Sequence, residues 1–292
     1  MKKKLSTKIK KLFLSSRFIA HKMITGMFRS RFIGAGLDFH SIRGYGFQDD
    51  GRLIDWNVTA KLNSPFVKTY KKTLNTNFFL CVDFSRSMSS SYNNIMLQDI
   101  GKELIYIFSL LALNMFIPIG LIYFTSCSSN LFMPSTSKTA IFRMLKTIDE
   151  INIANNGGSP LVDALKKASI ILRSRSIVFV ISDFNVKDYR KALIKLATQH
   201  DVVCIKLVDN NNFSLPYVGS VVFSDYEQDF SSILNTSSKS FRKKYNEKYK
   251  NELREWKDIC LSSHAYPLLI NSNDNLIKVL AGFFATYNNN IR

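Results

Sequence analysis

The sequence lacks most of the short motifs that mark enzymes. Neither a Gly-Lys-Ser/Thr phosphate-binding loop nor a Gly-x-Ser-x-Gly nucleophile elbow occurs in its 292 residues. A Gly-x-Gly pair at residues 34–36 is followed by Phe39 where a dinucleotide fingerprint needs its third glycine. The four histidines are scattered without the spacing of metal ligands. These absences favour a protein that is not an enzyme.

Cysteine is scarce too, with four residues and no Cys-x-x-Cys pair. Cys81 and Cys204 lie in apolar, strand-like runs, which is typical of small buried hydrophobic side chains. No signal-peptide pattern accompanies them. The sequence therefore predicts a cytoplasmic location, with peripheral attachment at the inner membrane face as an open alternative.

Charged residues are missing from the stretch between Leu104 and Ser137. A membrane-spanning helix needs about 20 apolar residues, so this stretch is long enough to suggest one. Asn114, Pro118 and Gly120 interrupt it, and its second half is rich in β-branched and aromatic residues. We therefore expect two elements of a soluble domain, a buried helix over 94–114 and a strand over 116–124.

Positive charge is abundant and lies mostly at the N-terminal end. Residues 1–72 hold 16 Lys/Arg and 4 Asp/Glu, which gives +12 of the net charge of +18. Apolar residues recur in residues 1–28 at helical spacing, so we expect a basic amphipathic helix there. Its first residues, 2–11, are candidates for contact with an anionic membrane surface. No specific nucleic-acid binding is expected, and a basic face that serves solubility alone is the alternative.

The rest of the chain predicts an α/β fold. Residues 29–75 contain several glycines and are expected to form an irregular or β-rich N-terminal extension. From residue 76 to 292, strands alternate with helices, which is typical of a doubly wound, mostly parallel sheet. The expected strands are 77–83, 116–124, an antiparallel return at 129–133, 176–182, 202–208 and 265–270. A hairpin over 218–235 and a charged helix over 238–261 complete the prediction.

Three loops of this sheet carry oxygen ligands. Asp83, Ser85 and Ser87 follow the first strand, Ser159 follows two glycines at 157–158, and Asp183 follows a later strand. Open α/β sheets bind ligands at the carboxyl ends of their strands. Carboxylates and hydroxyls are the ligands that Mg²⁺ or Mn²⁺ prefers. The alternative is a set of helix caps and turns that binds nothing. We expect Asp83, at a strand end, to be replaceable without loss of the fold.

These residues resemble the metal-ion-dependent adhesion site of von Willebrand factor A-like domains, which have a Rossmann-type sheet. In that family an Asp-x-Ser-x-Ser motif, a later Thr and a further Asp hold a divalent cation, and an acidic residue of a partner fills its open position. The resemblance implies that the metal is held by Asp83, Ser85, Ser87 and Asp183, with Ser159 in place of the Thr.

The upstream segment resembles the signature of the domain-of-unknown-function 58 family. It reads Arg-Ser-Arg-Phe-Ile-Gly-Ala-Gly-Leu-Asp-Phe at 29–39, Ile-Arg-Gly-Tyr at 42–45 and Asp-Asp-Gly-Arg-Leu-Ile-Asp-Trp at 49–56. The resemblance implies an association with a MoxR-type AAA+ ATPase. The charged and aromatic signature residues are Arg43, Asp49, Asp50, Arg52, Asp55 and Trp56. We interpret the cluster of Asp49, Asp50, Arg52, Asp55 and Trp56 as an ion-pair network under an aromatic lid that attaches this segment to the main domain. A catalytic role is the alternative.

The function implied is a non-enzymatic, chaperone-like protein-binding module. Its cofactor would be Mg²⁺ (or Mn²⁺). Its partner would be a MoxR-type AAA+ ATPase or a client protein that offers an acidic residue. Two alternatives remain: a Mg²⁺-dependent hydrolase or nuclease that uses the same carboxylates, and a membrane-surface scaffold without a metal.

Overall fold

The structure is a computed structural model. It describes residues 38–46, 51, 54–62, 64–71, 76–89, 91–92, 95–125, 128–151, 160–209, 220–225, 230–235 and 238–286. The helix predicted for residues 1–28, with the membrane contact of residues 2–11, lies outside them. The chain divides into two compact units, residues 1–22 with 76–283 and residues 23–75 with 284–292. Each unit is described by itself.

The smaller unit contains a two-stranded antiparallel sheet and a short helix. Strand β1 (Asp38–Gly44) pairs with β2 (Phe66–Lys71), and helix α2 (Trp56–Leu62) lies between them in sequence. The two strands agree with the prediction of a β-rich segment, but α2 was not predicted. Its start is marked by Asp55, whose Oδ1 accepts hydrogen bonds from the N–H groups of Asn57 at 3.0 Å and Val58 at 3.3 Å. Asp is a favoured N-cap residue for this reason.

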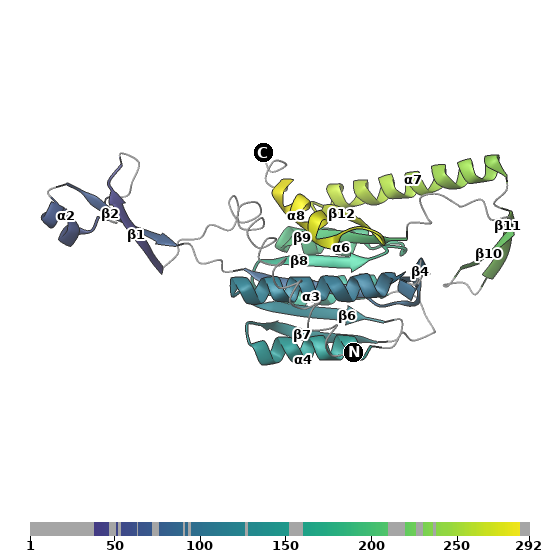
Figure 1. The fold of residues 1–292 in the computed structure, drawn as a ribbon, viewed down its shortest axis with the longest axis horizontal. Helices are drawn as coiled ribbons and strands as arrows, with labels where there is room; N and C mark the ends of the chain where they lie inside the picture. The colour runs from purple at the N-terminus through teal and green to yellow at the C-terminus, as the bar shows by residue number, and fades with distance from the viewer. Residues whose placement is uncertain are drawn as a thin grey trace. The chain divides into compact units, whose positions relative to one another are not determined.

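The larger unit is built on a six-stranded sheet (Figure 1). Its order is β12-β9-β8-β3-β6-β7, and every neighbouring pair is parallel except β6 and β7. This is the doubly wound, mostly parallel α/β sheet that the sequence predicts. The strands are β3 (Asn77–Asp83), β6 (Ile119–Phe124), β7 (Ser129–Ser135), β8 (Ser176–Ser182), β9 (Asp201–Val208) and β12 (Tyr266–Asn271).

Helices alternate with these strands along the chain. They are α3 (Leu97–Met115), α4 (Lys138–Asp149), α5 (Leu161–Ile171), α6 (Arg190–Gln199), α7 (Lys239–Ser262) and α8 (Leu276–Thr286). A 3₁₀ turn η2 (Arg86–Ser89) and the short strands β4 (Ser91–Tyr92) and β5 (Ile95–Met96) precede α3. The predicted hairpin is confirmed as β10 (Ser220–Asp225) and β11 (Phe230–Asn235).

The uncharged stretch folds as a helix and a strand, as predicted. Helix α3 ends where Phe116 adopts a left-handed conformation with φ of 56°, and its N–H donates to the oxygen of Ala112. Strand β6 then begins. At Gly120 a Cβ would lie 2.8 Å from the backbone oxygen of Phe132 on β7, so only glycine fits there. Among the described residues, we find no helix that is both long enough and apolar enough to cross a membrane.

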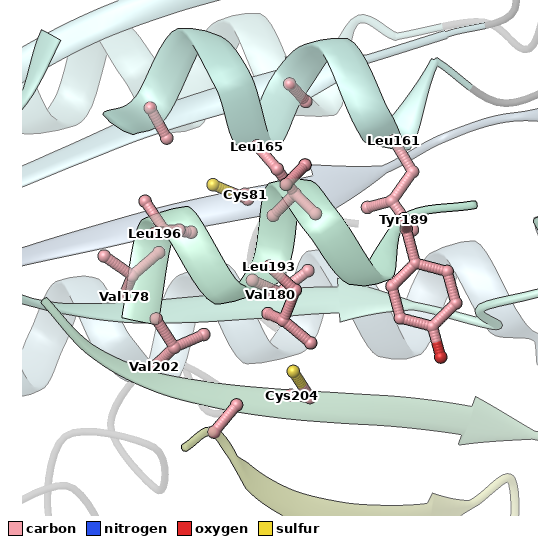
Figure 2. Close-up of a cluster of buried hydrophobic side chains, with 14 of the residues drawn as sticks. Cys81, Leu161, Leu165, Val178, Val180, Tyr189, Leu193, Leu196, Val202 and Cys204 are labelled. Atoms are coloured by element: carbon pink, nitrogen blue, oxygen red, sulfur yellow. The ribbon is translucent and has the colours of Figure 1, made fainter. Parts of the chain in front are cut away.

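Helices α5, α6 and α7 bury one face of the sheet. Cys81 of β3, Val180 of β8 and Cys204 of β9 contribute to a single apolar cluster with side chains from the three helices. Figure 2 shows these strand residues beside Leu165 of α5 and Leu193 of α6. Strands buried on both faces explain the near-continuous apolar runs in the sequence. The loops at the strand ends therefore extend from a well-packed core.

Candidate functional site

The candidate site lies where the order of the sheet reverses. Strand β3 has β6 on one side, reached through α3, and β8 on the other. Both neighbours run parallel to it. Open α/β sheets bind ligands at such a switch point, outside the carboxyl ends of the strands. Asp83 ends β3 and Ser182 ends β8, so the two residues meet at this edge.

Asp83 organises the loop that follows β3. Its carboxylate is fully buried, and Oδ1 accepts a hydrogen bond from the N–H of Ser85 at 2.8 Å. The N–H of Phe84 donates to the oxygen of Phe124 on β6, and the buried Phe84 ring contacts Tyr123 edge-on. These contacts fix the direction of the chain as it leaves the strand.

The two serine hydroxyls of this loop lie side by side. Ser85 Oγ and Ser87 Oγ are 3.0 Å apart, and Ser87 is half-buried at the start of η2. The buried side chain of Met88 anchors the turn. In an octahedral Mg²⁺ site with ligands at about 2.0–2.1 Å, adjacent ligands lie about 2.9 Å apart. The spacing of the two hydroxyls therefore fits two neighbouring positions on such an ion.

Ser182 joins the two carboxylates predicted for the site. Its hydroxyl donates to Oδ2 of Asp83 at 2.8 Å and accepts from the N–H of Phe184 at 3.0 Å. Asp183 Oδ1 lies 3.4 Å from the same hydroxyl and accepts from the N–H of Asn185 at 3.2 Å. The structure thus brings Asp83 and Asp183 to one place, although they are a hundred positions apart in sequence.

The loop after β8 is held in an unusual conformation. Phe184 has φ of 52°, which is uncommon for a bulky residue. Its ring packs against Tyr189 at 5.6 Å and Trp256 at 5.7 Å between ring centroids. This packing stabilises the turn that follows Asp183, whose side chain is half-buried.

Lys206 supports the same loop from β9. It is paired with Ser182 in the sheet, and its Nζ donates a hydrogen bond to the backbone oxygen of Asp183. The ammonium also lies 5.8 Å from the centre of the Trp256 ring, within range of a cation–π interaction. Burial lowers the pKa of Lys206, and the charge of Asp183 opposes this effect. Lys206 therefore connects α7 to the candidate site.

Ser182 and Lys206 were not predicted as site residues. Ser182 carries a readable signal, because it ends a buried strand directly beside Asp183. Lys206 is a single charge inside the apolar run of β9, which is an equally clear signal. Ser159 and residues 157–158 lie outside the described residues, so their expected role stays a prediction.

The chemistry of the site depends on hydroxyls as well as carboxylates. Among the described residues, no group of three or more His, Cys, Asp or Glu side chains could hold a metal ion. The site has two carboxylates, and the remaining candidate ligands are serine oxygens. All of these are hard oxygen ligands, and they match Mg²⁺ or Mn²⁺ better than zinc.

Asp83 corrects one expectation. It is not a replaceable residue at a strand end, because it is fully buried and accepts hydrogen bonds from both Ser85 and Ser182. Its replacement by alanine would leave two buried donors without this acceptor. The half-buried Ser87 is the better position at which to test ligand binding alone.

The signature residues that the structure describes differ from the expected arrangement. Trp56 is 70% exposed at the start of α2, and the buried Asp55 serves as the N-cap of that helix. Arg43 lies on β1. Asp49, Asp50 and Arg52 fall outside the described residues, so the ion-pair network stays a prediction. The expected aromatic lid over it is wrong for the described part of the chain.

The fold and the oxygen-lined edge define the class of protein. The sheet is that of a von Willebrand factor A-like α/β protein, with its candidate site at the switch point. The chain belongs to the family described as "Protein of unknown function DUF58", whose model matches residues 41–255.

Curated relatives share part of this sequence. The uncharacterized protein Rv1480 of Mycobacterium tuberculosis (strain ATCC 25618 / H37Rv) is 26% identical over 199 residues, which cover 66% of this chain and 62% of that protein. The uncharacterized protein Mb1516 of Mycobacterium bovis (strain ATCC BAA-935 / AF2122/97) shows the same identity and coverage. The chain therefore spans less than two thirds of the length of these relatives.

Several solved structures are distantly similar. The conserved hypothetical protein BatB from Bacteroides thetaiotaomicron has a TM-score of 0.43 and 12% identity, covering 73% of this chain and 98% of that chain. An aerotolerance-related membrane protein from Bacteroides fragilis NCTC 9343 has a TM-score of 0.44 and 15% identity, covering 74% and 100%. The VWA domain of SpRpn10 has a TM-score of 0.41 and 13% identity, covering 70% and 93%. At these scores the likeness says nothing of what the chain binds.

Proposed function

We propose that the chain is a non-enzymatic protein-binding module that holds Mg²⁺ or Mn²⁺ at the switch point of its sheet. The observation that carries this proposal is the 3.0 Å separation of Ser85 Oγ and Ser87 Oγ beside two carboxylates that Ser182 brings together. Ser159 is the further ligand that the family resemblance implies.

Each residue has a separate part in this function. Asp83 fixes the Ser85 backbone and orients Ser182, so that the negative charge and the two hydroxyls face the same edge. Lys206 fixes the backbone of Asp183. A divalent cation bound there would offer a coordination position to an acidic residue of a partner protein. Recognition would thus require a carboxylate that is free to approach the edge.

The resemblance to the family suggests the partner. It would be a MoxR-type AAA+ ATPase, or a client that the two proteins remodel together, in the cytoplasm. Metal-dependent phosphoester hydrolysis often uses two metals about 4 Å apart. The two carboxylates at this edge of the sheet are too few to hold two such metals. The non-enzymatic function is therefore favoured over a hydrolase or nuclease.

Calorimetric titration with MgCl₂ and MnCl₂ tests the site. We expect one binding event in the wild-type protein, and Ser87→Ala should weaken it by about tenfold or more because a ligand is lost. Ser89→Ala is the matched control, since Ser89 lies in the same 3₁₀ turn but bonds only to the backbone oxygen of Arg86 among the contacts described. Its affinity should stay within about twofold of the wild type.

Equal affinity in all three proteins, or no binding in the wild type, would reject the metal site. A pull-down of the MoxR-type ATPase should weaken in chelator and in Ser87→Ala but not in Ser89→Ala. Mn²⁺-dependent cleavage of p-nitrophenyl phosphate or single-stranded DNA that disappears in Ser87→Ala would instead establish the hydrolase alternative.

A further inference from the structure

Helix α7 has an uneven distribution of charge. Its first half, residues 239–250, contains six Lys/Arg and one Glu, a net charge of +5. Its second half, residues 251–262, contains two Lys/Arg and three Asp/Glu, a net charge of −1. The buried residues of the helix, Trp256 and Cys260, both belong to the second half. The first half is therefore basic and carries no buried side chain.

Two contacts show which way α7 runs across the sheet. Trp256 lies against Lys206 and Phe184, at the carboxyl end of the strands. Cys260 interacts with Cys204, two residues back along β9 toward the centre of the sheet. The helix is thus antiparallel to β9, and residues before Trp256 extend past the carboxyl edge.

The basic half of α7 projects beyond the same edge that carries the candidate site. At 1.5 Å per residue, Lys250 is about 9 Å along the helix from Trp256 and Lys239 about 26 Å. Figure 1 shows this part of α7 continuing past the ends of the strands toward β11. The projection therefore lies next to the place where a partner would approach.

Four basic residues of α7 share one exposed face. Lys239, Lys243, Lys250 and Arg254 are spaced at i, i+4, i+11 and i+15, and all four are exposed. We call them the basic stripe. Lys243 makes a long i,i+4 pair with Glu247, with 3.9 Å between Nζ and Oε1 and both side chains largely exposed. Exposed pairs of this kind are weak, so they compete little with a binding partner.

We propose that the basic stripe docks an acidic segment of the partner protein. This inference rests on the proposed function: one carboxylate of the partner reaches the candidate metal site, and acidic residues beside it in sequence lie along α7. From Lys239 to Arg254 the stripe is about 22 Å long at 1.5 Å per residue. An extended segment of about seven residues covers this length at about 3.3 Å per residue. The stripe supplies charge complementarity that steers the partner to the edge.

The composition of α7 favours a protein over a nucleic acid or a membrane as the occupant. Glu247 lies beside the stripe and pairs with Lys243, which interrupts the positive charge and is unfavourable against a continuous row of phosphates. The aromatic residues Phe241, Tyr245 and Tyr249 are half-buried and lie on other faces of the helix, so they offer no exposed platform for bases or lipid. A segment with spaced carboxylates fits this pattern better.

Fluorescence anisotropy with a fluorescein-labelled octaglutamate peptide tests the proposal on the full chain. The stripe variant K239Q/K243Q/K250Q removes three positive charges from α7. The control K138Q/R173Q/K195Q removes three exposed positive charges, one each from α4, the loop after α5, and α6. With MgCl₂ present, we expect the stripe variant to bind about tenfold more weakly than the wild type and to lose part of the salt dependence. The control should stay within about twofold.

The outcomes separate this inference from the metal site. A loss in the stripe variant supports the stripe, whereas wild-type binding that is unchanged by chelator counts against the metal. A loss with chelator or Ser87→Ala alone overturns the stripe and supports the metal. Equal weakening in the stripe and control variants would mean non-specific attraction to a basic protein and would overturn the stripe. The stripe proposal would also be overturned if the stripe variant lost binding to single-stranded DNA or phosphatidylserine vesicles while its peptide binding stayed unchanged.

Discussion

Each end of the central sheet buries a carboxylate, but the two are held by different chemistry. At the amino end, Asp201 is bound by the Arg175 guanidinium through two hydrogen bonds of 3.0 and 3.2 Å. At the carboxyl end, the hydrogen bonds described for Asp83 come from a backbone N–H and a hydroxyl, both uncharged and both at 2.8 Å. An ion pair neutralises its carboxylate within the protein, whereas neutral donors orient a carboxylate without cancelling its charge. The first arrangement suits structure and the second suits cation binding.

The same comparison applies to the lysine and histidine beside these carboxylates. Lys206, next to the candidate site, bonds to the protein through the Asp183 backbone and the Trp256 ring. His200, next to Asp201, is buried, and neither of its ring nitrogens has a hydrogen-bond partner among the described residues. The carboxyl end is therefore a connected polar network, while the amino end combines one ion pair with an unsatisfied imidazole.

The largest expected effect is at Asp83. Asp83→Ala leaves the Ser85 N–H and the Ser182 hydroxyl without their acceptor, which should lower the free energy of unfolding by about 2–4 kcal/mol. Asp83→Asn keeps the shape and an acceptor for Ser85, so it should lose less stability. Both variants should lose measurable Mg²⁺ binding, since the negative charge is gone. Urea unfolding and calorimetry together separate the two effects.

If Asp83→Asn binds Mg²⁺ as well as the wild type does, the neutral-donor interpretation of this carboxylate is wrong. If Asp83→Ala is as stable as the wild type, the buried hydrogen bonds contribute nothing. Either result would remove the contrast with Asp201.

A smaller effect is expected at the opposite end of the sheet. Arg175→Gln removes the charged partner of the buried Asp201 and should cost about 1–2 kcal/mol, because Arg175 itself is partly exposed. Mg²⁺ affinity should not change, since the site lies at the other edge. Raising the salt concentration should reduce the difference between the variant and the wild type in urea unfolding. A change in metal affinity would show that the two edges are not independent.

Lys206 should affect the site more than the fold. Lys206→Met removes the donor to the Asp183 backbone but also removes a buried ammonium, so stability should change by less than about 1 kcal/mol. Mg²⁺ affinity should fall about three- to tenfold because Asp183 loses its support. Lys187→Met, at an exposed lysine after the same loop, is the control. If Lys206→Met binds Mg²⁺ as tightly as the wild type does, then Lys206 only packs against Trp256 and does not support the site.

The sequence predicts the sheet well because its signals are strong and local. Apolar runs such as 77–83 and 176–182 are unmistakable as buried strands, and the positions of Asp83 and Asp183 at their ends follow directly. The alternation of elements then places both carboxylates at one edge. These predictions depend on pattern and topology, which a single sequence carries.

Contacts between distant residues could not be predicted in the same way. The hydrogen bond from Ser182 to Asp83 depends on the sheet pairing of two strands, and the contact of Lys206 with Trp256 depends on how α7 crosses the sheet. The burial of Asp83 was misjudged for the same reason, because a strand end is exposed only if no neighbour covers it. Helix α2 is too short to show a helical period of apolar residues in the sequence, and the N-cap residue Asp55 is its one sequence signal.

The smallest expected effect is a pH dependence of stability at His200. Burial lowers the pKa of His200 in the folded protein, and the positive charge of Arg175 acts in the same direction, while Asp201 opposes both. The unfolded chain has an ordinary imidazole with a pKa of about 6.5, so below that pH it binds more protons than the folded chain does. This contribution to stability is present above pH 6.5 and is lost as the pH falls below it.

Urea unfolding at pH 7.5 and pH 5.5 measures this effect, in a window where most carboxylates stay ionised. His200→Leu should be at least as stable as the wild type at pH 7.5, because it removes two buried nitrogens without partners, and it should lose less stability than the wild type at pH 5.5. Arg175→Gln should also weaken the pH dependence, since a nearby positive charge is gone. A wild-type protein whose stability is the same at both pH values would show that His200 is hydrated in solution, and the contrast between the two edges would then rest on the carboxylates alone.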